Sequence, residues 1–400
     1  MELRGDSGKQ GSIALLEGSH GILPHRRFRR ESHQRDSPVG IRQSSPAIKP
    51  DSAKRQERKG IVVADVNLGV IGLGRMGRIF SRHLARHSGG GRLASVSSRA
   101  IEAADEVAQQ GRDVQIYSNY QDLLNDDEID GVVIATLTNT HRDIVVAAAQ
   151  AGKAIFCEKP LALTLVETDT MLAAVESAGV LLQVGFMRRF DKGYVEAKRQ
   201  IVDGVIGHPI VAHAVSRDPA CPNTDWAAPT SSGGLILDLA IHDFDILRWL
   251  MDDEVRRVHT EGGVLSCPDL EEIDDIDSAL INLRFSDGGL GNVEAARNCG
   301  YGYDIRCEIR GTEGTLQIGY LRDTPVVSLT QQGATHDIVA WFENRFTPAY
   351  NAQLDHFVEC VQENKAPAVG AQDARLAQQI CMAAAQSYRE GRPVNVADLD

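Results

Sequence analysis

The sequence lacks the features of several protein classes. It has no apolar run near the roughly 18 residues that a membrane-spanning helix needs, so we expect no membrane association. Its seven cysteines are scattered and never spaced as CxxC, which disfavours a zinc site, and no metal is predicted. Their odd number favours buried thiols in a reducing compartment over a disulfide framework. We therefore expect a cytoplasmic protein.

Positive charge is scarce over most of the chain. The 42 Lys and Arg residues are outnumbered by 55 Asp and Glu residues, and the net charge is -13. This acidic balance argues against a nucleic-acid partner and against attraction to anionic membranes. Residues 1–60 are the exception, because they hold 13 basic and 7 acidic residues.

Residues 1–65 are predicted to form a disordered basic extension. They lack apolar periodicity, are rich in Ser, Arg, Gln and Gly, and contain two Ser-Pro pairs. A targeting peptide and a basic arm for nucleic acid are the functional alternatives. The acidic residues and the missing apolar segment argue against a targeting peptide. The lack of aromatic residues between the basic ones argues against a nucleic-acid-binding arm. We expect a dispensable extension, for which translation from an upstream start codon is one origin.

A nucleotide-binding motif follows this extension. The short apolar stretch at 67–71 runs directly into Gly72-Leu73-Gly74-Arg75-Met76-Gly77, and a helical pattern continues to about His87. Glycines at these positions allow a tight turn and a close approach of the backbone to a pyrophosphate, which the first N–H groups of the helix bind. The motif predicts a dinucleotide site, and a glycine-rich turn without a ligand is the alternative. The predicted cofactor contacts are Gly72, Gly74, Arg75, Met76 and Gly77.

The end of the second predicted strand, at 93–97, indicates which cofactor is bound. NAD-selective sites carry Asp or Glu about 20 residues beyond the glycine motif, whereas this sequence has Ser98 and Arg99 there. A serine can donate to a 2′-phosphate and a guanidinium can bind it, and Arg75 could approach the same group. The sequence therefore favours NADP(H), with NAD(H) possible. A solvated Arg99 and an Arg75 that contacts only the pyrophosphate are the alternatives.

Strands alternate with helices from residue 66 to about 185. Further strands are predicted at 114–117, 131–135, 154–157 and 180–184, and this alternation is typical of a Rossmann-type, doubly wound parallel sheet. Ligands bind at the carboxyl edge of such a sheet. Thr136, Asn139 and His141 follow the fourth strand, so we predict contacts with the nicotinamide ribose. A helix start capped by Asn139 or Thr140 is the alternative.

The fifth strand ends in Cys157-Glu158-Lys159-Pro160. The lysine lies just beyond the carboxyl edge of the sheet, where the ligand crevice is expected. A Lys-Pro pair in isolation is usually a surface loop, but the surrounding motifs favour a site. We predict that Lys159 is catalytic and that both Glu158 and Lys159 contact the cofactor.

A second domain is predicted over 186–400. Strand-like segments at 210–216, 257–264, 276–285, 290–296, 304–310 and 315–318, with turns between some of them, predict an α+β domain built on a large, mostly antiparallel open sheet. Two final helices, near 350–363 and 371–389, are expected to pack back on the first domain. No internal repeat is present.

One apolar helix is predicted within this domain, at 233–250. Asp238, His242 and Asp245 follow at i, i+4 and i+7, which places all three on one face of an α-helix. A carboxylate beside a histidine suits proton transfer near neutral pH. A satisfied internal hydrogen bond and a coincidental metal half-site are the alternatives.

Together these motifs resemble the Gfo/Idh/MocA family of nicotinamide-dependent sugar and polyol oxidoreductases, and within it the inositol 2-dehydrogenases. The resemblance covers roughly residues 66–395. The matching segments are Gly72 to Gly77, Phe156 to Pro160, Gln183 to Asp191, Asp238 with His242, and Tyr301 to Asp304.

The resemblance implies a role for each matching residue. Lys159 would hydrogen-bond the reacting hydroxyl and stabilise the oxyanion, with Glu158 as its supporting partner. His242 would accept the hydroxyl proton, and Asp238 would bind the substrate or orient the site. Further substrate contacts are implied at Arg188, Asp245 and Tyr303. A cis bond before Pro160 and a homo-oligomer, a tetramer or dimer through the open sheet face, are also implied.

One segment departs from the family pattern. Ser216-Arg217-Asp218-Pro219 stands where inositol 2-dehydrogenases carry His-Arg-Asn-Pro, so Ser216 and Asp218 are predicted substrate contacts of altered type. The expected activity is reversible oxidation of a ring hydroxyl of an inositol-like cyclic polyol, with the isomer open. A sugar dehydrogenase of the same family and a non-catalytic nucleotide-binding regulator are the alternatives. Lys159, Asp238 and His242 argue against the regulator.

Overall fold

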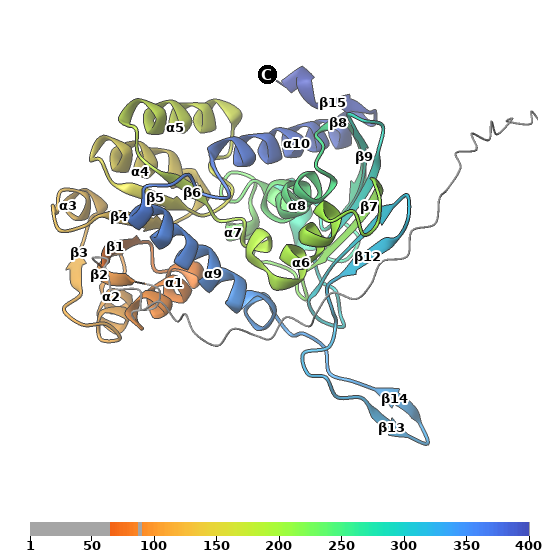
Figure 1. Ribbon diagram of the computed structural model, residues 1–400, viewed down its shortest axis with the longest axis horizontal. Coiled ribbons are helices and arrows are strands. Elements are labelled where there is room, and N and C mark those ends of the chain that lie inside the picture. The colour runs from red at the N-terminus through yellow and green to blue at the C-terminus, as the bar shows by residue number, and fades with distance from the viewer. Residues whose placement is uncertain (1–64, 87–89, 400) are drawn as a thin grey trace, which may run out of the picture. The chain divides into compact units, whose positions relative to one another are not determined.

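The computed structural model describes residues 65–86 and 90–399 (Figure 1). The predicted disordered extension therefore lies outside the described residues except for Asp65. In the described part, no helix combines the length and the apolar character needed to cross a bilayer.

Six parallel strands form the first sheet, in the order β3-β2-β1-β4-β5-β6. The central strand β4 is apolar and buried along its whole length, as expected for a parallel strand in a sheet covered by helices on both faces. The predicted Rossmann-type sheet is confirmed. The strands are β1 Val66–Ile71, β2 Gly91–Ser97, β3 Gln115–Tyr117, β4 Gly131–Ile134, β5 Ala154–Cys157 and β6 Leu182–Val184.

Five α-helices connect these strands: α1 Arg75–Ala85, α2 Ile101–Ala108, α3 Tyr120–Leu124, α4 Thr138–Gln150 and α5 Leu165–Ala178. Helix α4 begins at Thr138. Its N-cap is Leu137, which has no capping side chain. The alternative in which Asn139 or Thr140 caps the helix is therefore wrong, because both residues already lie within the first turn.

The second sheet has seven strands in the order β12-β11-β7-β10-β9-β8-β15. Its neighbouring strands are antiparallel apart from β7 and β10, which run parallel. The mostly antiparallel sheet is confirmed. The strands are β7 Pro209–Arg217, β8 Val255–Gly263, β9 Ser278–Phe285, β10 Leu290–Ala296, β11 Asp304–Gly311, β12 Thr315–Ile318 and β15 Val394–Asn395.

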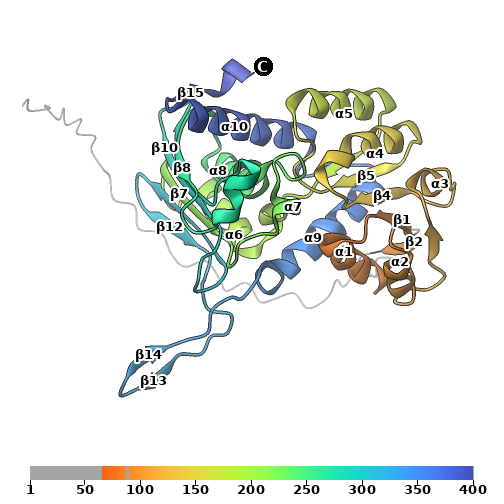
Figure 2. The same cartoon turned by 180° about the vertical axis from the view of Figure 1, so that it is seen from behind.

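Helices cover one face of this sheet (Figure 2). Alternate residues of β9, such as Ile281 and Leu283, are buried, while Leu280 on the other face is 51% exposed. Helices α8 Ile241–Met251 and α10 Ala371–Glu390 pack on the buried face. The remaining elements of the domain are η1 Met187–Phe190, α6 Lys192–Val202, α7 Thr224–Ala227, η2 Ile236–Ala240, η3 Pro268–Ile273 and η4 Val396–Leu399.

The last two long helices differ in where they pack. Helix α9, Phe342–Glu363, begins eight residues before its predicted start and packs on α1, β1 and β5 of the first domain, as expected. Phe357 from α9 stands edge-on to Phe156 of β5, with ring centroids 5.9 Å apart. Helix α10 contacts α5 and β6, but it also lies along β8 and α8. It therefore joins the two domains.

A hairpin that we did not predict follows β12. Strands β13 Ser328–Thr330 and β14 Gly333–Thr335 are exposed along their length, and both views show the hairpin projecting from the seven-stranded sheet (Figures 1 and 2).

The expectation that every cysteine is a free thiol is wrong for two of the seven. Cys221 and Cys267 form a disulfide across 46 residues of sequence, whereas Cys157, Cys299, Cys307, Cys360 and Cys381 are free. The pair forms where the loop after β7 packs on the segment before η3, in a small cluster with Ala227 and Leu270. Sequence spacing carries no sign of this contact. The cytoplasmic location stays a prediction.

Candidate active site

The glycine turn after β1 is closely packed on one side and open on the other. Gly72 has φ of +92°, and a side chain there would lie 2.7 Å from the carbonyl oxygen of Ala135. A side chain at Gly77 would collide with the carbonyl oxygen of Gly72. Gly74, in contrast, faces open space, because a methyl group added there would meet no atom within 4 Å. These residues therefore leave room for a pyrophosphate at the start of α1.

Arg75 points toward the second domain. Its guanidinium carbon lies 5.4 Å from the ring centroids of both Trp341 and Phe342, at the start of α9. It also lies close enough to Asp218 to oppose the rise in pKa of that carboxyl group. The aromatic contacts hold Arg75 at the interdomain side of the glycine turn, and no hydrogen bond joins it to Ser98 or Arg99 in the described structure. Met76, beside it in α1, is half-buried.

The loop after β4 supports the loop after β5. His141 is buried, and its Nδ1 lies 2.9 Å from the carbonyl oxygen of Pro160, while Nε2 lies 3.2 Å from that of Thr136. Burial lowers the pKa of His141, so the neutral ring can donate to only one of these oxygens, and Nδ1 has the shorter contact. Asn139 extends to the second domain, with Nδ2 3.5 Å from the carbonyl oxygen of Thr230. His141 thus lies beneath the loop that carries Lys159.

Glu158 is a buried acid beside Lys159. Its Oε2 accepts a hydrogen bond from the Lys159 main-chain nitrogen at 3.2 Å, and its Oε1 has no partner among the described residues. Burial raises the pKa of Glu158 to about 7, although the charge of Lys159 opposes the rise. The peptide bond between Lys159 and Pro160 is cis, as the family resemblance implied.

Lys159 reaches the second domain at Asp238. Its Nζ donates to the Asp238 main-chain oxygen at 2.7 Å and to Oδ1 at 3.1 Å. Burial alone would raise the pKa of Asp238, but Lys159 and Arg297 outweigh it and the pKa is lowered. Asp238 is therefore a carboxylate. The structure brings together these two residues, which are 79 positions apart in sequence.

His242 is a neutral imidazole in an apolar setting. Its ring stands perpendicular to Phe186 at 6.0 Å, and its Nδ1 is buried without a partner among the described residues. Burial, together with the charges of Lys159 and Arg188, holds the pKa of His242 well below its usual value. A neutral imidazole close to an ammonium group can accept a proton.

Asp245 is paired with Arg189 at the start of the second domain. The predicted helix at 233–250 is interrupted, because Gly233 and Gly234 have positive φ angles and a π-helical turn, η2, precedes α8. The Asp245 carboxylate accepts hydrogen bonds from Arg189 at 2.5 and 2.9 Å, so both of its oxygens are bound by the protein, and its role as a substrate contact stays a prediction.

Arg188 and Ser216 are bound by an acid that sequence reasoning missed. Asp243 Oδ1 accepts from Arg188 Nη1 at 2.5 Å and from the Ser216 hydroxyl at 2.8 Å, and Arg188 Nη2 donates to Ser216 Oγ at 2.9 Å. All three side chains are almost completely buried. The one signal was an extra acid next to His242 in an otherwise apolar helix. Tyr303 is also buried, and it packs on Trp341 and Phe346.

Arg297 is the second residue that sequence reasoning missed. Its Nη2 donates to Asp238 Oδ2 at 3.1 Å and its Nη1 donates to Asp218 Oδ2 at 3.2 Å. Its guanidinium carbon lies 5.4 Å from the ring centroid of Trp226, in α7. Burial raises the pKa of Asp218, and Arg297 opposes that rise. Arg297 has no motif around it, so no local pattern signals it.

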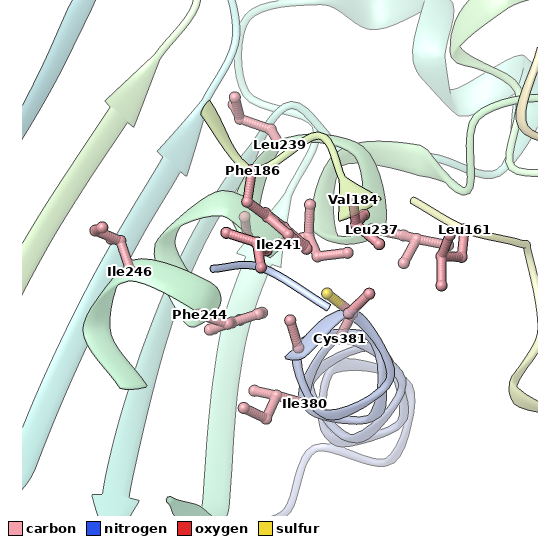
Figure 3. Close-up of a cluster of buried hydrophobic side chains, with 14 of the residues drawn as sticks. Leu161, Val184, Phe186, Leu237, Leu239, Ile241, Phe244, Ile246, Ile380 and Cys381 are labelled. Carbon is pink, nitrogen blue, oxygen red and sulfur yellow. The ribbon is translucent and has the colours of Figure 1, made fainter. Parts of the chain in front are cut away.

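An apolar cluster lies next to the η2 turn and the start of α8 (Figure 3). Phe186, Leu237 and Ile241 pack there near Ile380 and Cys381 of α10. Close packing of this kind holds the backbone that carries Asp238 and His242 in place.

The arrangement as a whole suits acid–base chemistry on an alcohol. A lysine ammonium can stabilise a developing alkoxide, and a neutral histidine can take its proton. Among residues 65–86 and 90–399, no group of three His, Cys, Asp or Glu side chains could hold a metal ion.

Two family models match this chain, one over each domain. Residues 66–186 match the Gfo/Idh/MocA family model described as "Oxidoreductase family, NAD-binding Rossmann fold", and residues 198–396 match its "C-terminal alpha/beta domain". The chain is 40% identical to scyllo-inositol 2-dehydrogenase (NAD(+)) of Bacillus subtilis, covering 83% of this chain and 96% of the relative. It is 35% identical to myo-inositol 2-dehydrogenase of Thermotoga maritima, covering 84% and 99%.

The fold is also similar to solved structures. A scyllo-inositol dehydrogenase from Lactobacillus casei, with bound NAD(H) and scyllo-inositol, superposes with a TM-score of 0.79 at 27% identity. The match covers 83% of this chain and 99% of that one.

Proposed function

This chain belongs to the Gfo/Idh/MocA oxidoreductase family, and on that premise we propose that it oxidises a secondary hydroxyl of an inositol-like cyclic polyol to a ketone, using a nicotinamide cofactor. The observation that carries the proposal is the hydrogen bond from Lys159 to Asp238 beyond the carboxyl edge of the first sheet, with a neutral His242 near enough for the charge of Lys159 to lower its pKa. The printed names of the relatives support the same substrate class.

In this proposal each side chain has one task. Lys159 donates a hydrogen bond to the substrate oxygen and stabilises the alkoxide as its proton leaves. His242 accepts that proton, and Asp238 holds the lysine at the domain boundary. A bound nicotinamide would supply the hydride acceptor. We propose that it is held by the glycine turn with Arg75 and Met76, by the loop at Thr136 and Asn139, and by Glu158.

In this proposal each predicted domain binds one ligand: residues 66–185 bind the cofactor, and residues 186–400 make most of the substrate contacts. We propose Asp218 and Tyr303 as substrate contacts. Arg188, Ser216 and Asp245 each hydrogen-bond to protein groups, so we propose that they support the substrate site without contacting the substrate directly.

A neutral substrate fits the charges of this site. The ammonium of Lys159 and the guanidinium of Arg297 are each paired with a carboxylate, from Asp238 and from Asp218. A phosphorylated or carboxylated sugar would bring an uncompensated negative charge next to these acids, which favours a neutral polyol.

NADP(H) is the cofactor form that the end of β2 favours. Arg99 is exposed and has no ion pair among the described residues, so its guanidinium is available to a 2′-phosphate. The Ser98 hydroxyl accepts a hydrogen bond from the Ala100 nitrogen at 3.1 Å and keeps its own proton for donation. The B. subtilis relative is named for NAD(+), so NAD(H) is the direct alternative.

We also propose a homo-oligomer, a tetramer or dimer, that uses the uncovered face of the second sheet, where Leu280 and Leu290 are exposed. Light scattering coupled to gel filtration measures the molar mass, and therefore the number of subunits, in solution. A monomer at micromolar concentration would overturn the proposal.

The decisive experiment measures initial rates with a panel of inositol isomers, other cyclic polyols and hexoses, each with NAD and NADP. We expect the highest kcat/KM on an inositol isomer. Preference for a hexose would favour the sugar dehydrogenase alternative. Cofactor binding without turnover of any polyol or sugar would contradict an enzyme.

A further inference from the structure

Arg297 and Asp218 meet because of the one parallel strand pair in the second sheet. Strands β7 and β10 run parallel with Ala296 opposite Arg217, so the residues that follow them, Asp218 and Arg297, leave the sheet at the same edge. Parallel strands place their carboxyl ends, and the groups just beyond them, side by side. The loop after β7 thereby brings its acid to the arginine.

The Arg297 side chain is buried, and its guanidinium group binds two carboxylates of the site. The residue is 3% exposed, and its two terminal nitrogens hold different carboxylates, Asp238 and Asp218. Trp226 covers the guanidinium, and Nε has no partner among the described residues. Burying a guanidinium is costly unless its charge is compensated, so the two carboxylates and the aromatic ring account for its location.

Asp238 is shared between two cations. Its main-chain oxygen and Oδ1 accept from Lys159, while Oδ2 accepts from Arg297. The charges therefore alternate along a chain from Lys159 through Asp238 and Arg297 to Asp218. If Arg297 were absent, Lys159 would be the one cation bound to Asp238, and the attraction between them would compete with binding of the substrate oxygen.

We propose that Arg297 is a positioning residue for the dehydrogenase reaction, which fixes Asp238 by its second oxygen and so leaves the Lys159 ammonium able to turn to the substrate oxygen. The proposal rests on the proposed function. Other groups that bear on Asp238 are Asp218 and the buried Asp275, both like charges, and no further titratable group is hydrogen-bonded to it in the described chain.

The test compares Arg297→Met with Arg297→Lys. We expect Arg297→Met to lower kcat by about 10²-fold while the dissociation constant of the reduced cofactor, measured by its fluorescence, changes by less than about twofold. Loss of a cation next to Asp238 makes its ionised form harder to maintain, so the acid limb of the kcat/KM profile should move to higher pH. Arg297→Lys should recover at least about tenfold of kcat and part of the shift.

Arg248→Met is the matched control, because Arg248 is also a buried arginine of this domain but pairs with Glu254. It should leave the pH profile unchanged. The positioning role would be overturned if a folded Arg297→Met variant kept the wild-type dependence of kcat/KM on pH. It would also be overturned if Arg248→Met moved the acid limb of that profile by the same amount.

A second measurement does not depend on turnover. Urea unfolding of Arg297→Met, Asp238→Asn and the double variant should show non-additive losses of stability, because the two side chains touch. If the losses were additive and the wild-type enzyme turned over a polyol, the coupling between Arg297 and Asp238 would be overturned while the proposed function would stand. A wild-type enzyme that turns over no polyol or sugar would overturn the proposed function, and the positioning role with it.

Discussion

The carboxyl group of Glu158 lies directly against Gly185, so that a side chain at 185 would sit 2.9 Å from the carboxyl carbon and both of its oxygens. The close approach buries Glu158 and leaves Oε1 without a partner among the described residues. As a result the acid next to Lys159 titrates near neutral pH rather than near its usual value.

Glu158→Gln should remove a pH dependence of stability. The folded pKa of about 7 lies above the usual value of 4.5, so stability is fully present below pH 4.5 and is lost as pH rises through 7. The loss amounts to about 3 kcal/mol for a shift of this size. We expect the free energy of urea unfolding to fall between pH 5 and 8 in the wild type and to fall less in the variant. Exposed Glu176→Gln is the control, and parallel curves for wild type and Glu158→Gln would contradict the prediction.

Lys159→Ala should lower turnover by at least about 10²-fold and leave cofactor binding largely intact, because it removes the charge that stabilises the alkoxide. Steady-state rates and cofactor fluorescence measure the two effects. Lys192→Ala, an exposed lysine at the start of α6, is the control. A near-normal kcat would remove Lys159 from the mechanism.

His242→Gln should lower kcat by a similar factor, at least about 10²-fold, because it removes the proton acceptor. It should also change acid stability. The folded pKa of His242 lies well below 6.5, so below pH 6.5 the unfolded chain takes up a proton that the folded one does not, and wild-type stability falls. The variant should lose less stability between pH 7 and 5. Exposed His213→Gln should behave like the wild type in both assays.

Ser98→Asp should shift preference toward NAD(H), because the new carboxylate repels a 2′-phosphate and can bind the ribose hydroxyls. The ratio of the kcat/KM values with NADP and with NAD measures this preference. Arg112→Ala, at an exposed arginine, is the control. If the ratio does not move, the end of β2 does not contact the adenosine ribose.

Local patterns were enough to predict the two sheets and part of the site. The glycine motif, the strand ending in Glu158-Lys159-Pro160 and the pair Asp238 and His242 each lie within a few residues of chain, where φ angles and helical spacing decide the geometry. The same local reasoning missed the π-helical turn η2, which interrupts the predicted helix at 233–250.

By itself, then, the sequence determined two domains, a nucleotide turn and a lysine at the edge of the first sheet, because backbone conformation and apolar periodicity are properties of neighbouring residues. Only the tertiary structure decided which charges face one another. Asp238 meets Lys159 across 79 residues and Arg297 across 59, and Cys221 meets Cys267 across 46. Such contacts depend on which strand ends share an edge, as β7 and β10 do, and a one-dimensional pattern does not record that pairing.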